Sequence, residues 1–243
     1  MGELDWQRRR EEMEKRYAQL SARQAAQRSL KLADLIKSSR SVLLGDPGTG
    51  KTTVTRYITY ALASNDVTYT GASARGLTPA LIRIANYAKA YERDSTLHLI
   101  EYVEKELMPR PEFGRYLRHE IESGECLIIL DGLDEVTNPG LRIQVTDRIQ
   151  EMVAGFSANR YMVTSRIVGY DVSPLTREFK HATLKELTAE DRERFVRLWY
   201  DAIKSEISES TRAEGAEDLI EALLTKPQIA RMGANPLLLT IMV

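Results

Sequence analysis

The chain has 243 residues and a net charge of −1, from 34 basic and 35 acidic side chains. With 43% hydrophobic and 28% charged residues, it can bury a substantial core, which excludes a chain that is disordered throughout. No run approaches the roughly 18 apolar residues needed to cross a bilayer, and the near-neutral charge argues against a protein held to nucleic acid by bulk positive charge.

Residues 1–40 are predicted to form an N-terminal helical segment. They are rich in Arg, Glu, Gln, Ala and Leu, with neither Pro nor Gly after Gly2, and this composition favours helices. Basic side chains outnumber acidic ones in this segment. The surplus fits a solvated helix face with ion pairs between successive turns, and a basic contact surface is the alternative.

Residues 41–187 alternate short apolar runs with longer amphipathic segments, which is the pattern of an α/β domain. The apolar runs suit parallel strands that are covered on both faces. We therefore expect a three-layer sandwich around a mostly parallel, five-stranded sheet. Six runs are candidates for its strands: Ser41–Leu44, Val67–Thr70, Ala80–Ile84, Cys126–Leu130, Tyr161–Thr164 and His181–Leu184.

The first candidate strand leads into a full match to the phosphate-loop motif GxxxxGK[ST], and a predicted helix follows at Thr53. Glycines let successive backbone N–H groups point at phosphate oxygens, and the helix N-terminus adds positive potential. Lys51 is expected to reach the β and γ phosphates, and Thr52 to bind Mg²⁺. A chance glycine-rich turn is the alternative. The predicted phosphate-binding residues are Gly45, Asp46, Pro47, Gly48, Thr49, Gly50, Lys51, Thr52 and Thr53.

Acidic residues follow the run Cys126–Leu130, whose cysteine is expected to be a small buried thiol. Asp131 comes at the carboxyl end of that strand, where ligands bind in open α/β sheets, and is the predicted metal ligand beside Thr52. Asp134 and Glu135 lie within one turn of it and are predicted to orient a water against the γ phosphate. The alternative is a helix N-terminus with acidic residues in its first turn.

A further polar group follows the strand Tyr161–Thr164. Adjacent parallel strands deliver their carboxyl ends to one crevice, so Arg166 is predicted to reach the γ phosphate and report its presence. A surface arginine at the end of a strand is the alternative.

Residues 188–243 are predicted to form a small helical subdomain. Thr188 and Asp191 match a capping box at the start of one helix, and two more helical stretches cover Ala216–Leu224 and Pro236–Val243. The last stretch is apolar and has no glycine or basic residue to end it, so we expect the chain to continue in a longer parent protein.

Residues Ser41–Val243 resemble the NACHT family, a branch of the STAND class of P-loop NTPases that is related to AAA+ proteins. The resemblance rests on the phosphate loop, on Leu127–Val136, on Val163–Arg166 and on Asn235–Leu239. In this family a small residue follows the metal-binding Asp, and acidic residues come three and four places after that Asp. Common AAA+ motors instead place Glu directly after it, where this chain has Gly132.

The resemblance implies a switch controlled by ATP and ADP with Mg²⁺. Arg166 would be its first sensor, and Pro236 would pack on the adenine ring. It also implies a winged-helix domain after Val243 and self-association of the full-length parent, in a signalling role such as defence. We expect the present chain to be truncated before that domain, monomeric and cytoplasmic.

Three functions remain open from the sequence. The favoured one is a signalling switch with slow ATP hydrolysis; the others are a scaffold that binds nucleotide without hydrolysing it and a motor acting on nucleic acid. The charge balance argues against the motor. A GTP-binding protein is less well supported than an ATP-binding one, because the sequence has no Asn-Lys-x-Asp segment for reading guanine.

Overall fold

The structure, a computed structural model, describes residues 30–68, 70–168, 170, 174–176, 178–203 and 209–243. Residues 1–29, which hold most of the predicted N-terminal helical segment, lie outside this set. Within the described residues, the chain forms one all-parallel, five-stranded sheet in the order β2-β3-β4-β1-β5. Its strands are β1 (Arg40–Leu44), β2 (Thr78–Arg83), β3 (Cys126–Asp131), β4 (Arg160–Ser165) and β5 (Lys180–Thr183).

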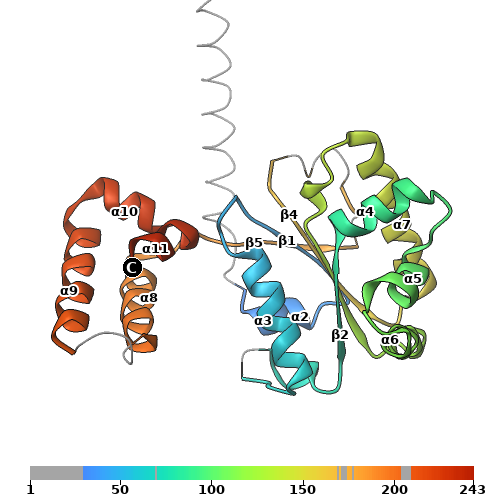
Figure 1. Ribbon diagram of the computed structural model, residues 1–243, viewed down its shortest axis with the longest axis horizontal. Coiled ribbons are helices and arrows are strands. Elements are labelled where there is room, and N and C mark those ends of the chain that lie inside the picture. The colour runs from blue at the N-terminus through green and yellow to red at the C-terminus, as the bar shows by residue number, and fades with distance from the viewer. Residues whose placement is uncertain (1–29, 69, 169, 171–173, 177, 204–208) are drawn as a thin grey trace, which may run out of the picture. The chain divides into compact units, whose positions relative to one another are not determined.

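Helices and short helical turns connect the strands (Figure 1). Each long connection between two parallel neighbours has to cross over the sheet, and helices are the usual crossover. The α-helices of this part are α2 (Leu32–Ile36), α3 (Lys51–Ala63), α4 (Ile84–Arg93), α5 (Leu99–Tyr102), α6 (Pro111–Ser123) and α7 (Pro139–Gly155). The shorter turns are η1 (Ala72–Ala74), the π-helical η2 (Val103–Leu107) and η3 (Leu133–Glu135).

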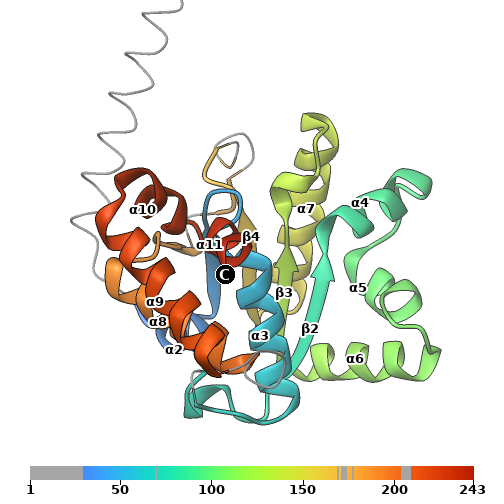
Figure 2. The same cartoon turned by 60° about the vertical axis from the view of Figure 1, so that its left-hand side comes forward.

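The sheet is covered on both faces, which makes the predicted three-layer sandwich. Side chains alternate between the two faces of a strand, so Ile128 and Leu130 of β3 join one buried cluster while Leu127 and Ile129 join another. The first cluster includes residues of α4 to α7, and the second includes residues of α2 and α3. Figure 2 shows α3 on one side of β2 and β3 with α5 and α6 on the other.

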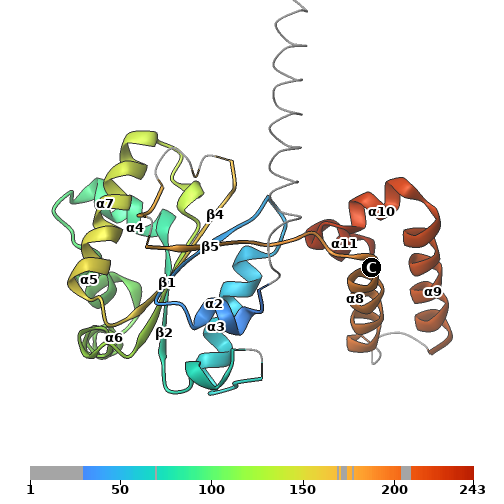
Figure 3. The ribbon, with the colours of Figure 1, turned by 180° about the vertical axis from the view of Figure 1, so that it is seen from behind.

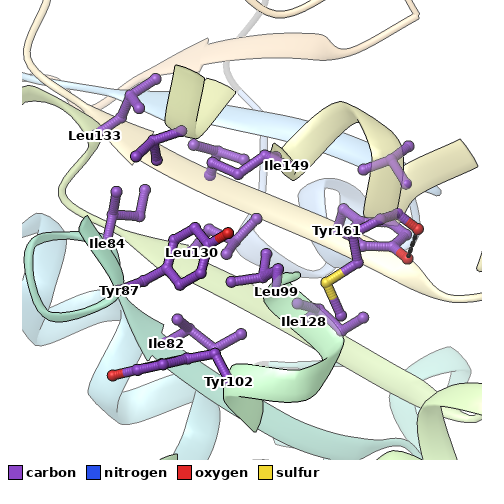
Figure 4. Close-up of a cluster of buried hydrophobic side chains, with 14 of the residues drawn as sticks. Ile82, Ile84, Tyr87, Leu99, Tyr102, Ile128, Leu130, Leu133, Ile149 and Tyr161 are labelled. Carbon is purple, nitrogen blue, oxygen red and sulfur yellow. Dashed lines mark hydrogen bonds between the residues drawn. The ribbon is translucent and has the colours of Figure 1, made fainter. Parts of the chain in front are cut away.

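The larger cluster is the main core of the α/β part (Figure 4). It is built from aliphatic side chains of the sheet and from aromatic side chains such as Tyr87 and Tyr102, whose rings meet edge to face at 5.3 Å. All six residues of β3 are buried. A strand that is buried along its whole length fixes the position of its last residue and of those that follow. In β3 these are Asp131 and the residues after it, which belong to the predicted site.

One predicted strand is wrong. The described residues of Val67–Thr70 form turns, and the sheet does not include them. Asp66 directs this local structure, since its Oδ1 accepts a hydrogen bond from the Thr68 backbone N–H (2.9 Å) and its carbonyl accepts one from the Thr70 hydroxyl (2.9 Å). Asp side chains favour such turns by bonding the backbone two residues on. Local hydrogen bonds therefore replaced the expected pairing with a neighbouring strand.

The carboxyl-terminal part of the chain is helical, as predicted (Figure 3). Thr188 and Asp191 form the predicted capping box at the start of α8. A small cluster around Val196, Ile220 and Leu239 packs these helices together. None of the described helices is long and apolar enough to cross a membrane. The helices are α8 (Ala189–Ala202), α9 (Glu209–Thr225), α10 (Pro227–Gly233) and α11 (Pro236–Met242).

Candidate nucleotide-binding site

The motif that links β1 to α3 forms a closed loop at the carboxyl end of the sheet. The Gly45 N–H donates to the Ser165 carbonyl of β4 (3.2 Å), and the Thr49 hydroxyl donates to the Asp46 carbonyl across the loop (2.8 Å). A Cβ at Gly45 would lie 2.5 Å from the Thr49 hydroxyl oxygen, so a larger residue at this bend would displace the Thr49 side chain that closes the loop. The strand-to-helix context that the motif requires is therefore present.

The inner side of this loop has the features of a phosphate cradle. Gly50 precedes α3 in a left-handed conformation (φ 90°), and a Cβ there would meet no described heavy atom within 4 Å. The first N–H groups of α3 have no partner within the helix, because a helix leaves its first turn of donors unpaired. Open space next to unpaired donors and the positive end of a helix fits an anion such as a polyphosphate.

Lys51 lies at the centre of the site. Its Nζ donates to the carbonyls of Gly45 (2.6 Å) and Asp46 (3.1 Å). Burial is the main cause that lowers the pKa of Lys51 from its ordinary value, and the charge of Arg166 lowers it further. The carboxylates of Asp134 and Asp131 oppose that shift. The pairing of β4 with both β1 and β3, and the hydrogen bond from Gly45 to Ser165, place the loop that holds Lys51 beside the residues that follow β3 and β4.

Asp131 is held rigidly at the end of β3. It is 5% exposed, and its Oδ1 accepts a hydrogen bond of 2.6 Å from the hydroxyl of Thr164 on the adjacent strand β4. The same hydroxyl accepts a bond of 2.8 Å from the Gly132 N–H. Thr164 therefore orients the carboxylate and satisfies the backbone that follows it, which is the kind of support a metal-ligating carboxylate needs.

Asp134 and Arg166 form an ion pair across the ends of β3 and β4. Arg166 Nε lies 2.8 Å from Asp134 Oδ2, and the Arg166 backbone N–H donates to Oδ1 (3.0 Å). The Asp134 side chain is 9% exposed and that of Arg166 is 52% exposed. Both carboxylate oxygens of Asp134 are thus used to hold Arg166, and the arginine keeps one side in solvent.

Glu135 is exposed and folds back over the chain that leaves β3. A Cβ at Gly132 would lie 2.9 Å from Glu135 Cδ and 3.1 Å from its Oε1. Gly132 also has φ 84°, a left-handed conformation that favours glycine. The small residue after Asp131 therefore has a local reason: it makes the turn and leaves room for the Glu135 side chain.

The donors present fit Mg²⁺ bound together with phosphate. Thr52 supplies a hydroxyl at the start of α3, and Asp131 keeps Oδ2 for a metal while Oδ1 bonds Thr164. In the part of the chain that the structure describes, no three His, Cys, Asp or Glu side chains gather as a metal site on their own. This fits Mg²⁺, which usually takes one or two protein oxygens and completes its octahedron with phosphate and water.

Pro236, the predicted adenine contact, begins α11 and is partly exposed. The residue before it, Asn235, touches the phosphate loop: its Nδ2 donates to the Pro47 carbonyl at 2.9 Å. Beside Ala234 lies an open cavity of about 420 Å³. Its lining residues are Glu186, Leu187, Arg192, Ala230, Arg231 and Ala234.

The predicted residues of the site come from four segments far apart in the sequence. The phosphate loop, Asp131 with Asp134, and Arg166 lie at the same end of the paired strands β1, β4 and β3. The segment at Pro236 reaches the loop through Asn235. Sequence reasoning missed two contributors. Thr164 and Asn235 both lie within segments that resemble the family, yet nothing in the local pattern indicates what their side chains contact.

Comparison of the sequence with known proteins identifies relatives of part of the chain. Adenylate kinase 8 from Rattus norvegicus is 27% identical over 147 residues, which cover 59% of this chain and 28% of that protein. Adenylate kinase 8 from Mus musculus is 26% identical over 145 residues, covering 58% and 27%. The chain thus spans less than a third of the length of these relatives, and the match concerns a part of each.

Solved structures with a similar arrangement include domain III of the replication initiation protein DnaA from Thermotoga maritima. It has 11% sequence identity and a TM-score of 0.47, and the match covers 87% of this chain and 86% of that one. Drosophila ORC bound to DNA has 16% identity and a TM-score of 0.48, with 84% and 55% covered. The assignment of the fold rests on the strand order and not on these scores.

The sequence profile of the NACHT domain matches residues 39–203, more than half of the chain. The matched range includes the phosphate loop, β3 with its acidic residues, and β4 with Arg166. These are the segments that the fold brings together. The chain belongs to the NACHT family of P-loop NTPases.

Proposed function

We propose that this chain is an ATP- and ADP-binding switch with slow ATP hydrolysis, whose nucleotide state controls oligomerisation and signalling of a longer cytoplasmic parent protein. Nucleotide binding follows from membership of the NACHT family. The observation that best supports the rest is geometric: the parallel pairing of β1, β4 and β3 brings the phosphate loop, Asp131 and the Asp134–Arg166 ion pair to the same end of the sheet. In this proposal, residues 41–187 bind the nucleotide and residues 188–243 respond to it.

Each residue of the site has a proposed role. The backbone of Gly45–Thr53 holds the phosphates, and Lys51 leaves its own loop carbonyls to contact the β and γ phosphates. Pro236 contacts the base. Arg166 reports the γ phosphate. The contact of both Asp134 oxygens with Arg166 favours Asp134 as the residue that positions this arginine.

Hydrolysis requires a water that is oriented against the γ phosphate. We assign this task first to Glu135, since its side chain is exposed and lies beside Gly132, the residue that follows Asp131. Thr52 and Asp131 would hold Mg²⁺, which supplies neutralisation of phosphate charge when bound.

Competition binding tests the nucleotide preference. A fluorescent ATP analogue is displaced by ATP, ADP or GTP, with wild type and Lys51→Ala side by side. We expect ATP and ADP to compete better than GTP, and Lys51→Ala to lose a charge-assisted contact worth about 1.5 to 3 kcal/mol. A preference for GTP, or unchanged affinity in Lys51→Ala, would remove the proposal in this form.

Single-turnover ATP hydrolysis separates the switch from the non-hydrolysing scaffold. Glu135→Gln should keep nucleotide affinity while turnover falls by about 10²- to 10⁴-fold, the usual contribution of a positioned acid or base. Asp134→Asn should also slow turnover, because it loosens Arg166. Wild-type protein that binds ATP and never hydrolyses it would favour the scaffold.

A further inference from the structure

The Asn235 side chain makes two contacts, one at the N-terminus of α11 and one on the phosphate loop. Its Oδ1 accepts a hydrogen bond from the Leu237 N–H (3.0 Å), which caps the helix. Its Nδ2 donates to the Pro47 carbonyl (2.9 Å). A second bond from the Leu237 N–H reaches the Gly48 carbonyl (3.2 Å). The start of α11 is therefore fastened to two consecutive carbonyls of the loop.

The contact is close enough to restrict the loop sequence. A Cβ at Gly48 would lie 2.6 Å from Asn235 Oδ1 and 3.0 Å from Leu237 Cβ. Gly48 stands at a position that the motif GxxxxGK[ST] leaves open. Here the left-handed backbone (φ 79°) and the approach of α11 both require glycine.

The direction of these bonds matters for phosphate binding. In a planar trans peptide the C=O and the following N–H point in opposite directions. A donor that holds the Pro47 carbonyl on the α11 side therefore turns the Gly48 N–H toward the other side of the loop. The Asn235 amide and the Leu237 N–H thus bond to loop carbonyls on the outer side of the loop. By holding these carbonyls outward, they orient the backbone N–H groups that face the interior of the loop.

We propose that Asn235 is a positioning residue that couples occupancy of the phosphate loop to the docking of the helical part on it. The inference rests on the proposed nucleotide function. When α11 is docked, the loop is held in one conformation and binds phosphates more tightly. By reciprocity, nucleotide in the loop strengthens the docking of α11 by the same factor. The helical part then responds to nucleotide through a side chain that contacts the loop backbone.

Asn235→Asp is the most informative variant. Asp caps a helix as well as Asn does, so α11 keeps its N-terminal hydrogen bonds. The carboxylate has no N–H to donate to Pro47 and faces that carbonyl with a negative charge. We expect Asn235→Asp to weaken ATP and ADP binding about tenfold, as the loss of one hydrogen bond with added repulsion predicts, with little change in the unfolding midpoint.

The chain offers a matched control in Asn138→Asp. Asn138 also precedes a proline and caps a helix, α7, through a bond of 3.1 Å from the Leu141 N–H. Asn138→Asp makes the same change of amide to carboxylate at the same helix position, and the hydrogen bond of the Asn138 side chain is made within α7. This variant should bind ATP and ADP as wild type does.

Hydrogen exchange reads the coupling in the other direction. In wild type, ADP should slow exchange of the Leu237 and Leu238 amides, and Asn235→Asp should abolish most of that protection. The inference is overturned if Asn235→Asp binds nucleotide as tightly as wild type and gains equal protection. If wild type binds no nucleotide, the proposed function and this inference fall together, which the first titration already reveals.

Discussion

Replacing Thr164 by Val removes one hydroxyl from a buried pair of contacts without changing the shape of the side chain. Thr164 is fully buried, and its hydroxyl both donates to Asp131 Oδ1 (2.6 Å) and accepts from the Gly132 N–H (2.8 Å). After the substitution, a buried carboxylate oxygen and a buried N–H lose their partner together. The valine methyl that replaces the hydroxyl can satisfy neither group.

The magnitude follows from these two losses. A hydrogen bond to a charged group contributes about 1.5 to 3 kcal/mol, and an unsatisfied buried donor costs about 1 to 3 kcal/mol. We therefore expect Thr164→Val to lower the free energy of unfolding by about 3 to 5 kcal/mol. Thr164→Ser keeps the hydroxyl and removes one methyl, so its cost should be near 1 kcal/mol, about that of one buried methylene.

Urea unfolding at 25 °C, followed by far-ultraviolet circular dichroism, measures both variants against wild type. The midpoint should shift far more for Val than for Ser, with an unchanged slope in urea. The reasoning is refuted if Val and Ser cost the same, because the methyl group and not the hydroxyl would then carry the stability of this position.

Three other predictions concern separate parts of the chain. Burial lowers the pKa of Lys51 in the nucleotide-free chain, and a bound phosphate would raise it. The affinity for ATP should therefore be highest at pH values below the pKa of Lys51 in the nucleotide-free chain, and should fall as the pH rises through that pKa. Lys51→Arg stays charged and should show no such fall as the pH is raised. Binding titrations at several pH values would check this, and equal profiles for wild type and Lys51→Arg would contradict the role of the lysine charge. Gly114→Ala should lower the free energy of unfolding by about 1 to 3 kcal/mol, since the new Cβ would lie 2.0 Å from the Glu104 carbonyl oxygen. Gly155→Ala, whose Cβ would meet no described heavy atom within 4 Å, should leave the stability unchanged or raise it. Thermal unfolding measures both variants, and a stabilising Gly114→Ala would count against the packing of α6 on η2. Burial raises the pKa of Cys126 to about 12, so near pH 8 iodoacetamide should modify this thiol in the native chain only as fast as the chain unfolds. Mass spectrometry measures the labelling rate. Rapid labelling would contradict the prediction, because it would mean that the thiol is accessible in the folded chain.

The elements that the sequence predicts well are those with a strong local pattern. β3 is a continuous apolar run that ends in Asp131, and the structure buries all six of its residues. The phosphate loop contains its own glycines and leads directly into α3. In both cases the residues that decide the structure lie within a few positions of one another. The local sequence therefore predicts the element without knowledge of the segments that pack against it.

Val67–Thr70 shows where such local reading fails. Its β-branched and aromatic residues favour a strand, yet Asp66 directs the segment into turns through its own hydrogen bonds. The edge strand beside β3 is β2, which overlaps the separately predicted strand Ala80–Ile84. Intrinsic strand propensities differ by only about 1 kcal/mol between the most and least favourable residue types. A few hydrogen bonds, each contributing a similar free energy, easily exceed that difference.

The contacts that complete the site join distant segments and leave no local signal. Thr164 meets Asp131 across 33 residues of sequence, and Asn235 meets Pro47 across 188. A threonine in a strand and an asparagine before a proline both have ordinary local explanations, as a β-branched residue and as a helix cap. Their second role appears only when the strands and helices are brought together.

A crystal structure of the chain with Mg²⁺ and a non-hydrolysable ATP analogue tests the central claim most directly. We predict density for the polyphosphate inside the Gly45–Thr52 loop, the Lys51 ammonium on the β and γ phosphates, and a metal between the Thr52 hydroxyl and the Asp131 carboxylate. A nucleotide bound elsewhere, or phosphates in the loop with Asp131 turned away from the metal, would contradict the account.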